Sequence, residues 1–280
     1  AVIMLAPEVF EPLRQVGAQF HASANGVTAS RAAFDIIEQA QDVAAPGTSP
    51  CPDMTATAIV LDGVGVRARG AWGPAPTDGV IRPGTVTAFA GPSGAGKSTL
   101  VACLLADVTP DAGRILLRPQ ASFPHGDDLA LTDVDPVSWR SGLSWVPQSP
   151  TLIPGSILDN MGGLPLADLE ESARATGFDA VLSTTPHGWE STIGVGGVGL
   201  SVGQRQRLAL TRALAARSQV VILDEPTAHL DAVSEETVVR AITTMREEGR
   251  TVIVIAHRSA VIGVADTIID VASAEEEALA

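Results

Sequence analysis

The chain has 280 residues, a formal net charge of −14, and hydrophobic residues at 45% of its positions. This length fits one large domain, or one domain with an extension, and it supplies a sizeable apolar core. A surface that follows DNA or RNA needs clustered Lys and Arg, so the acidic balance argues against a nucleic-acid partner. The two cysteines, Cys51 and Cys103, lack metal-binding spacing, and we expect no disulfide framework.

Residues 1–41 are predicted to form mainly helix. Apolar side chains recur there at spacings near three, four and seven, at Phe10, Leu13, Val16, Phe20, Val27, Phe34 and Ile37. Residues 1–6 are apolar but far fewer than the roughly 20 that span a bilayer, and they lack the basic region of a signal peptide. We interpret residues 1–41 as the end of a transmembrane domain and a helical extension; packing against the chain's own domain is the alternative.

A linker is predicted at residues 42–54, which contain the run Ala-Ala-Pro-Gly-Thr-Ser-Pro-Cys-Pro, and an α/β domain at residues 55–280. Strands are predicted at 58–61, 79–81, 85–90, 220–223 and 251–255, and helices at 97–106 and 205–216. The last two strands are continuous apolar runs, as in central parallel strands. Strands that alternate with helices indicate crossover connections. Residues 272–280 are expected to form a solvated helix or a frayed tail.

A glycine-rich run between a predicted strand and a predicted helix matches G-x-x-x-x-G-K-[ST]. Its residues are Gly91, Pro92, Ser93, Gly94, Ala95, Gly96, Lys97, Ser98 and Thr99. The glycines let backbone N–H groups converge on phosphate oxygens, and the helix N-terminus adds partial positive charge. Lys97 is predicted to reach the β- and γ-phosphates and Ser98 to bind Mg²⁺. ATP and Mg²⁺ are therefore the expected cofactors.

Two carboxylates follow the apolar run at 220–223 directly, at Asp224 and Glu225. Ligands lie at the carboxyl ends of strands in open α/β sheets. Asp224 is predicted to hold Mg²⁺, and Glu225 to act as the general base on the attacking water.

Three more polar residues lie at or near the ends of apolar runs: Gln148, Asp231 and His257. Any one of them alone is usually a cap or turn residue. Because they follow a phosphate loop in order, we interpret them as groups that contact the γ-phosphate, with Gln148 also a metal ligand.

A second anion site is predicted where Leu200-Ser201-Val202-Gly203-Gln204 leads into a helix. Ser201 lies at the N-cap position, and Gly203 and Gln204 follow it. One chain does not need two such phosphate sites, so this one is expected to serve ATP bound to another chain.

Taken in order, these segments resemble the nucleotide-binding domain of ABC transporters over about residues 55–270. The loop at 91–99 is similar to the Walker A motif, Gln148 to the Q-loop glutamine, 200–204 to the signature, Asp224-Glu225 to Walker B, Asp231 to the D-loop and His257 to the switch histidine. The resemblance implies a P-loop NTPase with a RecA-like core, an antiparallel β subdomain and a helical subdomain. It also implies a dimer in which Ser201, Gly203, Gln204 and Asp231 approach the bound nucleotide.

Residues 138–160 resemble exporter-type ABC proteins, in which the ATPase follows a transmembrane domain. Residues 5–14 and the signature variant with Val202 resemble the CydD-like subunit of bacterial thiol exporters, which support cytochrome bd assembly. This resemblance implies export of glutathione or cysteine, a position at the cytoplasmic face of the bacterial plasma membrane, and a second half-transporter as partner. A heterodimer is favoured, and a homodimer is the alternative.

The chain departs from the family pattern at three places. Val202 replaces the first glycine of the signature pair, and Val195 stands where many exporters carry Glu. The chain has no Tyr, and no aromatic residue aligns with the one that usually stacks on adenine. Trp72 is the candidate substitute.

Two other functions fit the phosphate loop. The chain could be a non-transport ABC ATPase that remodels protein or nucleic-acid complexes, against which the charge and the apolar start argue. It could also be a non-catalytic module that binds ATP and dimerises, but Glu225 and His257 are both present.

Overall fold

The computed structural model describes residues 46–68, 70–122, 127–227, 232–256 and 258–275. The predicted helix at 1–41 and the site residues Asp231 and His257 lie outside these ranges. Within them, no helix combines the length and apolar character needed to cross a bilayer.

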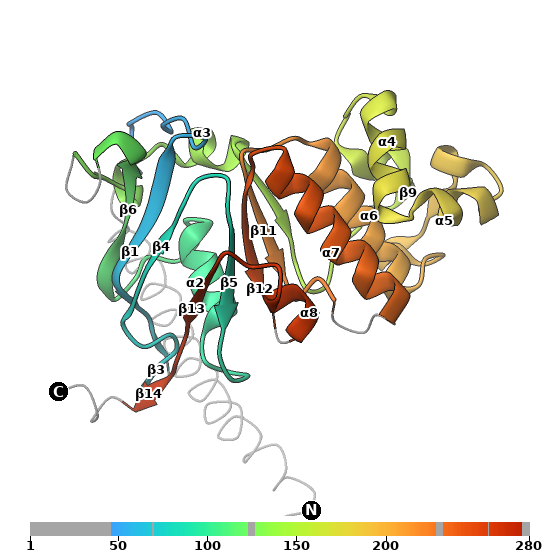
Figure 1. Ribbon diagram of the computed structural model, residues 1–280. Helices are drawn as coiled ribbons and strands as arrows, with labels where there is room; N and C mark the ends of the chain where they lie inside the picture. The colour runs from blue at the N-terminus through green and yellow to red at the C-terminus, as the bar shows by residue number, and fades with distance from the viewer. Residues whose placement is uncertain (1–45, 69, 123–126, 228–231, 257, 276–280) are drawn as a thin grey trace, which may run out of the picture. The chain divides into compact units, whose positions relative to one another are not determined.

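A five-stranded parallel sheet forms the centre of the domain (Figure 1). Its order is β13 (Thr267–Asp270), β5 (Val86–Ala90), β12 (Thr251–Ile255), β11 (Val220–Asp224) and β8 (Leu143–Val146). Asp224 pairs with Ile255, Ile255 with Phe89, and Leu223 with Val146. The carboxyl ends of four strands therefore reach the same edge. The predicted α/β class with central parallel strands is confirmed.

Side-chain alternation along the central strands supplies two apolar cores. In β11, Val220 and Ile222 face one core, while Val221 and Leu223 face the other. The continuous apolar run therefore reflects burial on both faces, as expected for a parallel sheet covered on both sides.

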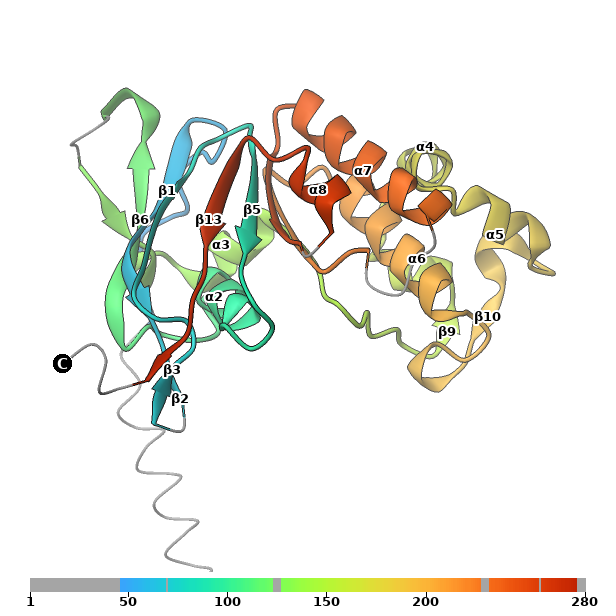
Figure 2. The ribbon, with the colours of Figure 1, turned by 60° about the horizontal axis from the view of Figure 1, so that its bottom comes forward.

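On one side, helix α2 (Lys97–Leu104) packs between the central sheet and an antiparallel sheet, as Figure 2 shows. That sheet has the order β4 (Thr77–Ile81), β1 (Thr57–Gly65), β6 (Ala112–Pro119) and β7 (Leu129–Ala130). A smaller sheet pairs β14 (Ala274–Glu275), β3 (Ala71–Trp72) and β2 (Arg67–Ala68). This is the predicted antiparallel β subdomain. Residues 272–280 were expected to form a helix or a frayed tail; of their described part, residues 274–275 form β14 instead, because Ala274 pairs with Trp72, and residues 276–280 lie outside the described ranges.

On the other side lie α6 (Val202–Ala215), α7 (Ala232–Glu247) and α8 (Ser259–Ile262). Beyond α6, a third core joins α4 (Leu166–Thr176) and α5 (Asp179–Thr184) to the hairpin of β9 (Gly155–Ser156) and β10 (Thr192–Ile193). This third core belongs to the helical subdomain. The remaining short elements are α3 (Pro136–Ser141) and the 3-10 turns η1 (Gln120–Ser122), η2 (Leu131–Asp133), η3 (Leu158–Met161), η4 (Gly188–Glu190) and η5 (Val195–Gly197).

The described part of the predicted linker is bonded to the domain. Ser49 forms a parallel β-bridge with Val134, and the backbone N–H of Cys51 donates to Ser138 Oγ at 3.1 Å. Met54 is buried in the core of the β subdomain, and its N–H donates to a glutamine oxygen next to β11, Gln219 Oε1, at 3.0 Å. Residues 49–54 are thus held against the domain by hydrogen bonds from their backbone.

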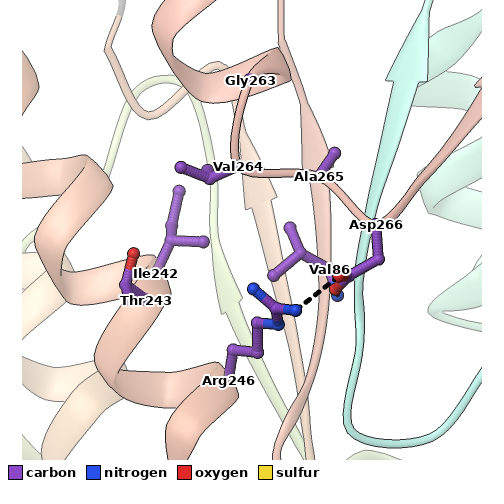
Figure 3. Close-up of a pocket in the computed structure, with 8 residues that line it drawn as sticks. All are labelled: Val86, Ile242, Thr243, Arg246, Gly263, Val264, Ala265 and Asp266. Atoms are coloured by element: carbon purple, nitrogen blue, oxygen red, sulfur yellow. Dashed lines mark hydrogen bonds and ion pairs between the residues drawn. The ribbon is translucent and has the colours of Figure 1, made fainter.

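The last turns of α7 are tied to the central sheet beside a cavity of about 310 Å³ (Figure 3). Arg246 Nη2 lies 2.6 Å from Asp266 Oδ1, and Asp266 Oδ2 accepts a hydrogen bond from the Val86 N–H at 2.9 Å. One carboxylate therefore joins the helix to the start of β5, the strand that leads into the glycine-rich loop.

Candidate active site

The glycine-rich loop connects β5 to α2, and two of its glycines are required by close backbone approach. A Cβ at Gly91, where φ is 149°, would lie 2.1 Å from Val271 O. A Cβ at Gly96, where φ is 92°, would lie 2.1 Å from the carbonyl carbon of Gly73. The loop is therefore in close contact with the residue after β13 of the central sheet and with the residue after β3, and side chains at these two positions would open it.

Lys97 begins α2 and is only 5% exposed. Its Nζ donates to Gly91 O at 2.9 Å and to Pro92 O at 2.8 Å. Burial lowers the pKa of Lys97, and the nearby carboxylates of Glu225 and Asp224 oppose that shift. The ammonium group therefore lies inside the loop, where phosphate oxygens can replace the two carbonyls.

Two acidic residues follow β11 at the same edge. Asp224 is 8% exposed, burial raises its pKa, and Ser98 Oγ donates to its Oδ1 at 3.4 Å. Glu225 has a φ of 47°, an uncommon value for a residue with a side chain, and its N–H donates to Ile255 O at 3.2 Å. The neighbouring strand thus holds the Glu225 backbone in a strained conformation, as often occurs at functional sites.

Gln148, two residues beyond β8, reaches the same place. Its Nε2 donates to Glu225 Oε2 at 2.9 Å. The strand order explains this contact between Gln148 and Glu225, because β8 lies next to β11 and the two strands are parallel. The residues predicted around the phosphates, Lys97, Ser98, Gln148, Asp224 and Glu225, are brought together.

A pocket of about 690 Å³ runs from these groups to the hairpin of β2 and β3. It is lined by Ala68, Ala71, Trp72, Gly73, Ser93, Gly94, Gly96, Lys97, Ser98, Thr99, Gln148, Glu225 and Ser273. The volume suits a nucleotide-sized ligand. The hairpin residues and Ser273 were missed in the sequence, apart from Trp72, because contacts between segments distant in the chain bring them to the pocket.

The donor set near the loop fits a hard divalent cation. Ser98 Oγ and the buried Asp224 carboxylate lie side by side, and the Gln148 amide donates a hydrogen bond to the carboxylate of Glu225, the residue after Asp224. Oxygen ligands from hydroxyl, carboxylate and amide groups suit Mg²⁺, which also keeps several waters. The described residues contain no cluster of three His, Cys, Asp or Glu side chains for another metal.

The predicted second anion site lies at the start of α6. Ser201 Oγ accepts from the Gln204 N–H at 3.2 Å, and Gln204 Oε1 accepts from the Ser201 N–H at 2.8 Å. This capping box starts the helix at Val202, three residues before the predicted start. Val202 is half exposed, and Ser201, Gly203 and Gln204 are not among the described residues that line the pocket. Val195 is exposed in the preceding turn.

The ABC transporter family matches residues 76–228 of the chain. The cyclolysin secretion/processing ATP-binding protein of Bordetella pertussis is 39% identical over 195 residues, which are 68% of this chain and 26% of that protein. The mycobactin import ATP-binding/permease protein of Mycolicibacterium thermoresistibile is 37% identical over 215 residues, covering 75% of this chain and 33% of the relative.

A fatty acid ABC transporter ATP-binding/permease protein of Mycobacterium tuberculosis is 32% identical over 269 residues, 92% of this chain and 40% of that protein. Among solved structures, a bacterial Atm1-family ABC exporter with ATP bound matches with a TM-score of 0.74 and 26% identity, over 97% of this chain and 48% of that chain. The chain spans less than half the length of each of these relatives.

Proposed function

Because the chain belongs to the ATP-binding domains of ABC transporters, which are ATPases, we propose that it hydrolyses ATP in the pocket beside the glycine-rich loop and so powers transport. The observation that carries the proposal is the convergence of Lys97, Ser98, Asp224, Glu225 and Gln148 at one strand edge. Phosphoryl transfer needs little more than positioned charge and an oriented water, and these groups supply both.

Each residue has a proposed role. The backbone N–H groups of residues 91–99 and the Lys97 ammonium bind the phosphate chain, and Glu225 takes the proton from the attacking water. Gln148 orients Glu225 and the water, as its bond to that carboxylate supports. Asp231 and His257, assigned from the family pattern alone, contact the nucleotide and the γ-phosphate.

Ser98, Asp224 and Gln148 are the proposed Mg²⁺ ligands. When bound, the cation neutralises charge on the β- and γ-phosphate oxygens. Two of these proposed ligands already lie together, because the Ser98 hydroxyl donates a hydrogen bond to the buried Asp224 carboxylate.

We propose a dimer as the active assembly, in which Ser201, Gly203 and Gln204 contact ATP bound to the second chain. The exposed position of Val202 at the start of α6, outside the pocket of its own chain, supports this arrangement. A related half-transporter is the favoured partner, and a second copy of this chain is the alternative.

Export of a thiol such as glutathione or cysteine, from the cytoplasmic face of the bacterial plasma membrane, is the proposed transport reaction. The thiol assignment rests only on the resemblance of residues 5–14 and Val202. The named relatives concern cyclolysin, mycobactin and fatty acids, so they do not support it. ATP-dependent uptake of labelled glutathione, and separately of labelled cysteine, into inside-out vesicles that hold the full-length protein and its partner tests it. Absence of both glutathione and cysteine uptake would reject the thiol assignment.

Relatives named ATP-binding/permease proteins favour transport over remodelling of protein or nucleic-acid complexes.

Glu225→Gln tests the hydrolytic site. The amide cannot accept the proton from water, so we expect ATP turnover to fall about 100-fold or more while ATP binding is kept. Turnover is measured as phosphate release, and binding by titration calorimetry. Glu236→Gln, an exposed change on α7, is the matched control and should leave both unchanged. Undiminished hydrolysis in Glu225→Gln would show that another group is the base and would reject the assignment.

A further inference from the structure

The cavity at the end of α7 lies at the amino end of β5, whereas the glycine-rich loop follows the carboxyl end of that strand. A strand rises about 3.3 Å per residue, so Val86 and Gly91 are about 16 Å apart along it. The described residues that line this cavity and those that line the nucleotide pocket have no member in common. The cavity is lined by Val86, Ile242, Thr243, Arg246, Gly263, Val264, Ala265 and Asp266.

Aliphatic side chains form much of the cavity wall. Val86 and Ile242 are fully buried in the core beneath the cavity, and Val264 and Ala265 are half-buried and pack against the same core. The volume of about 310 Å³ is at the small end for ligand pockets. This part of the cavity therefore suits a short hydrocarbon group.

The rim of the cavity carries one charge of each sign. Figure 3 shows the guanidinium of Arg246 pointing toward Asp266, where Nη2 lies 2.6 Å from Oδ1. Asp266 Oδ2 accepts from the Val86 N–H at 2.9 Å. A guanidinium has five N–H groups and a carboxylate has about four acceptor positions, so these contacts leave bonding capacity on both groups. The two side chains are 47% and 27% exposed, and a ligand can reach them from solvent.

The paired charges decide which ligands fit. A purely anionic ligand bound to Arg246 would lie close to the Asp266 carboxylate, and a purely cationic ligand bound to Asp266 would lie close to the guanidinium. Each would meet a like charge, which costs free energy at such short range. A ligand with one carboxylate and one ammonium group can place each beside its opposite.

We propose that this cavity is a second ligand site, which binds a free α-amino acid with a small aliphatic side chain, such as leucine. The carboxylate bonds to the guanidinium of Arg246, the ammonium group bonds to Asp266, and the side chain packs against Val86, Ile242 and Val264. In a free amino acid all three groups branch from one carbon, so a cavity of this size can contact them together.

The first experiment titrates the 280-residue chain with leucine, with isocaproate, which lacks the ammonium group, and with isoamylamine, which lacks the carboxylate. Calorimetry is expected to give a Kd of about 1 mM or tighter for leucine and values about 10-fold weaker or more for both analogues. An analogue that binds as tightly as leucine would overturn the proposal. Absence of saturable leucine binding up to about 20 mM would do the same.

The second experiment changes the rim. Arg246→Met removes the guanidinium and is expected to weaken leucine binding about 10-fold or more, because the carboxylate loses its charged donors. Arg240→Met, at an exposed position on the same helix and outside the cavity lining, is the matched control and should leave the affinity unchanged.

Arg246→Lys covers the case in which the methionine variant does not fold. It keeps a cation beside Asp266 but lacks the planar fork that can hold two carboxylates, so leucine binding should fall about fivefold or more. Melting curves show which variants are folded. Unchanged leucine affinity in a folded variant at Arg246 would overturn the proposal.

The third experiment repeats the leucine titration in the presence of saturating Mg²⁺ and ATP. The two sites share no described lining residue, so the leucine affinity is expected to stay within about twofold. Loss of leucine binding when ATP is added would place leucine in the nucleotide pocket and would overturn the assignment to this cavity.

Discussion

Asp224 is a site residue whose buried charge lowers the stability of the nucleotide-free protein. Its carboxylate is 8% exposed at the end of β11, and burial raises its pKa. Removal of a charge from water costs free energy unless a counter-ion is close, and Lys97 and Ser98 offset only part of that cost. The nucleotide-free protein therefore carries a destabilising group that a bound cation would relieve.

Asp224→Asn should raise the melting temperature of the nucleotide-free protein by about 2–4 °C, the effect of about 1 kcal/mol in a domain of this size. A carboxyl whose folded pKa is raised destabilises the protein above that pKa, and the penalty vanishes below the pKa of the unfolded chain. The gain should therefore be larger at about pH 7 than at about pH 4. Calorimetry at both pH values checks it, with exposed Asp270→Asn as control. A gain of equal size at both pH values would contradict this explanation.

The residues near the phosphate loop could be named from the sequence, whereas those at the β2–β3 hairpin, apart from Trp72, could not. Residues 91–99, Asp224, Glu225 and Gln148 each follow a buried strand, so strand order alone brings them together. Ala68 and Ala71 are brought together by pairing of β2 with β3, and Ser273 reaches the same place through pairing of β3 with β14, two segments about 200 positions apart. Short strands of two residues carry no periodic pattern from which such pairing could be inferred.

At the scale of elements, α6 is fixed at both ends by different means. Its first turn is held by the capping box of Ser201 and Gln204. Its last turn is held by Arg250, a buried residue before β12, whose Nη1 donates to Ala213 O at 3.2 Å and Nη2 to Leu214 O at 2.8 Å. A cation at a helix C-terminus also interacts favourably with the helix dipole. Helix α6 is thus bonded at both its first and its last turn.

Arg250→Met is expected to lower the free energy of unfolding by about 2–4 kcal/mol, because two buried carbonyls lose their donors and the Glu248 carboxylate loses its partner. Chemical denaturation measures the change. Arg240→Met, on the exposed face of α7, is the control and should stay within about 0.5 kcal/mol of wild type. An equal loss in the two variants would show that Arg250 has no special part in the stability of α6.

Strands with continuous apolar runs were predicted closely, whereas elements whose ends depend on single contacts were not. The apolar run at 251–255 became β12 with the same bounds, and that at 220–223 became β11 with one further residue. Helix α6 begins three residues before its predicted start because the side chains of Ser201 and Gln204 cap it there. Residues 274–275 form a strand because they pair with β3. Boundaries depend on such single contacts, which average patterns do not encode.

For the molecule as a whole, one pocket is lined by residues from the β subdomain and the central sheet, which share a core, and by a residue that leads to the helical subdomain, which has a core of its own. The β2–β3 hairpin belongs to the β subdomain, the loop at 91–99 follows the central sheet, and Gln148 leads toward the helical subdomain. A ligand that bridges all three is bound only when they are folded together. Ligand binding should therefore stabilise them as one cooperative unit.

Thermal unfolding of the 280-residue chain with Mg²⁺ and ATP tests this coupling. At a free ATP concentration of about 100 times Kd, the folded state gains about 2.7 kcal/mol, which shifts the melting temperature of a domain of about 200 residues by about 5–10 °C. The whole transition is expected to move, since the three parts share the ligand. Lys97→Met removes the ammonium from the loop and should abolish most of the shift. Two separate transitions, of which ATP moves only one, would show that the β subdomain unfolds independently and that the pocket does not couple it to the central sheet.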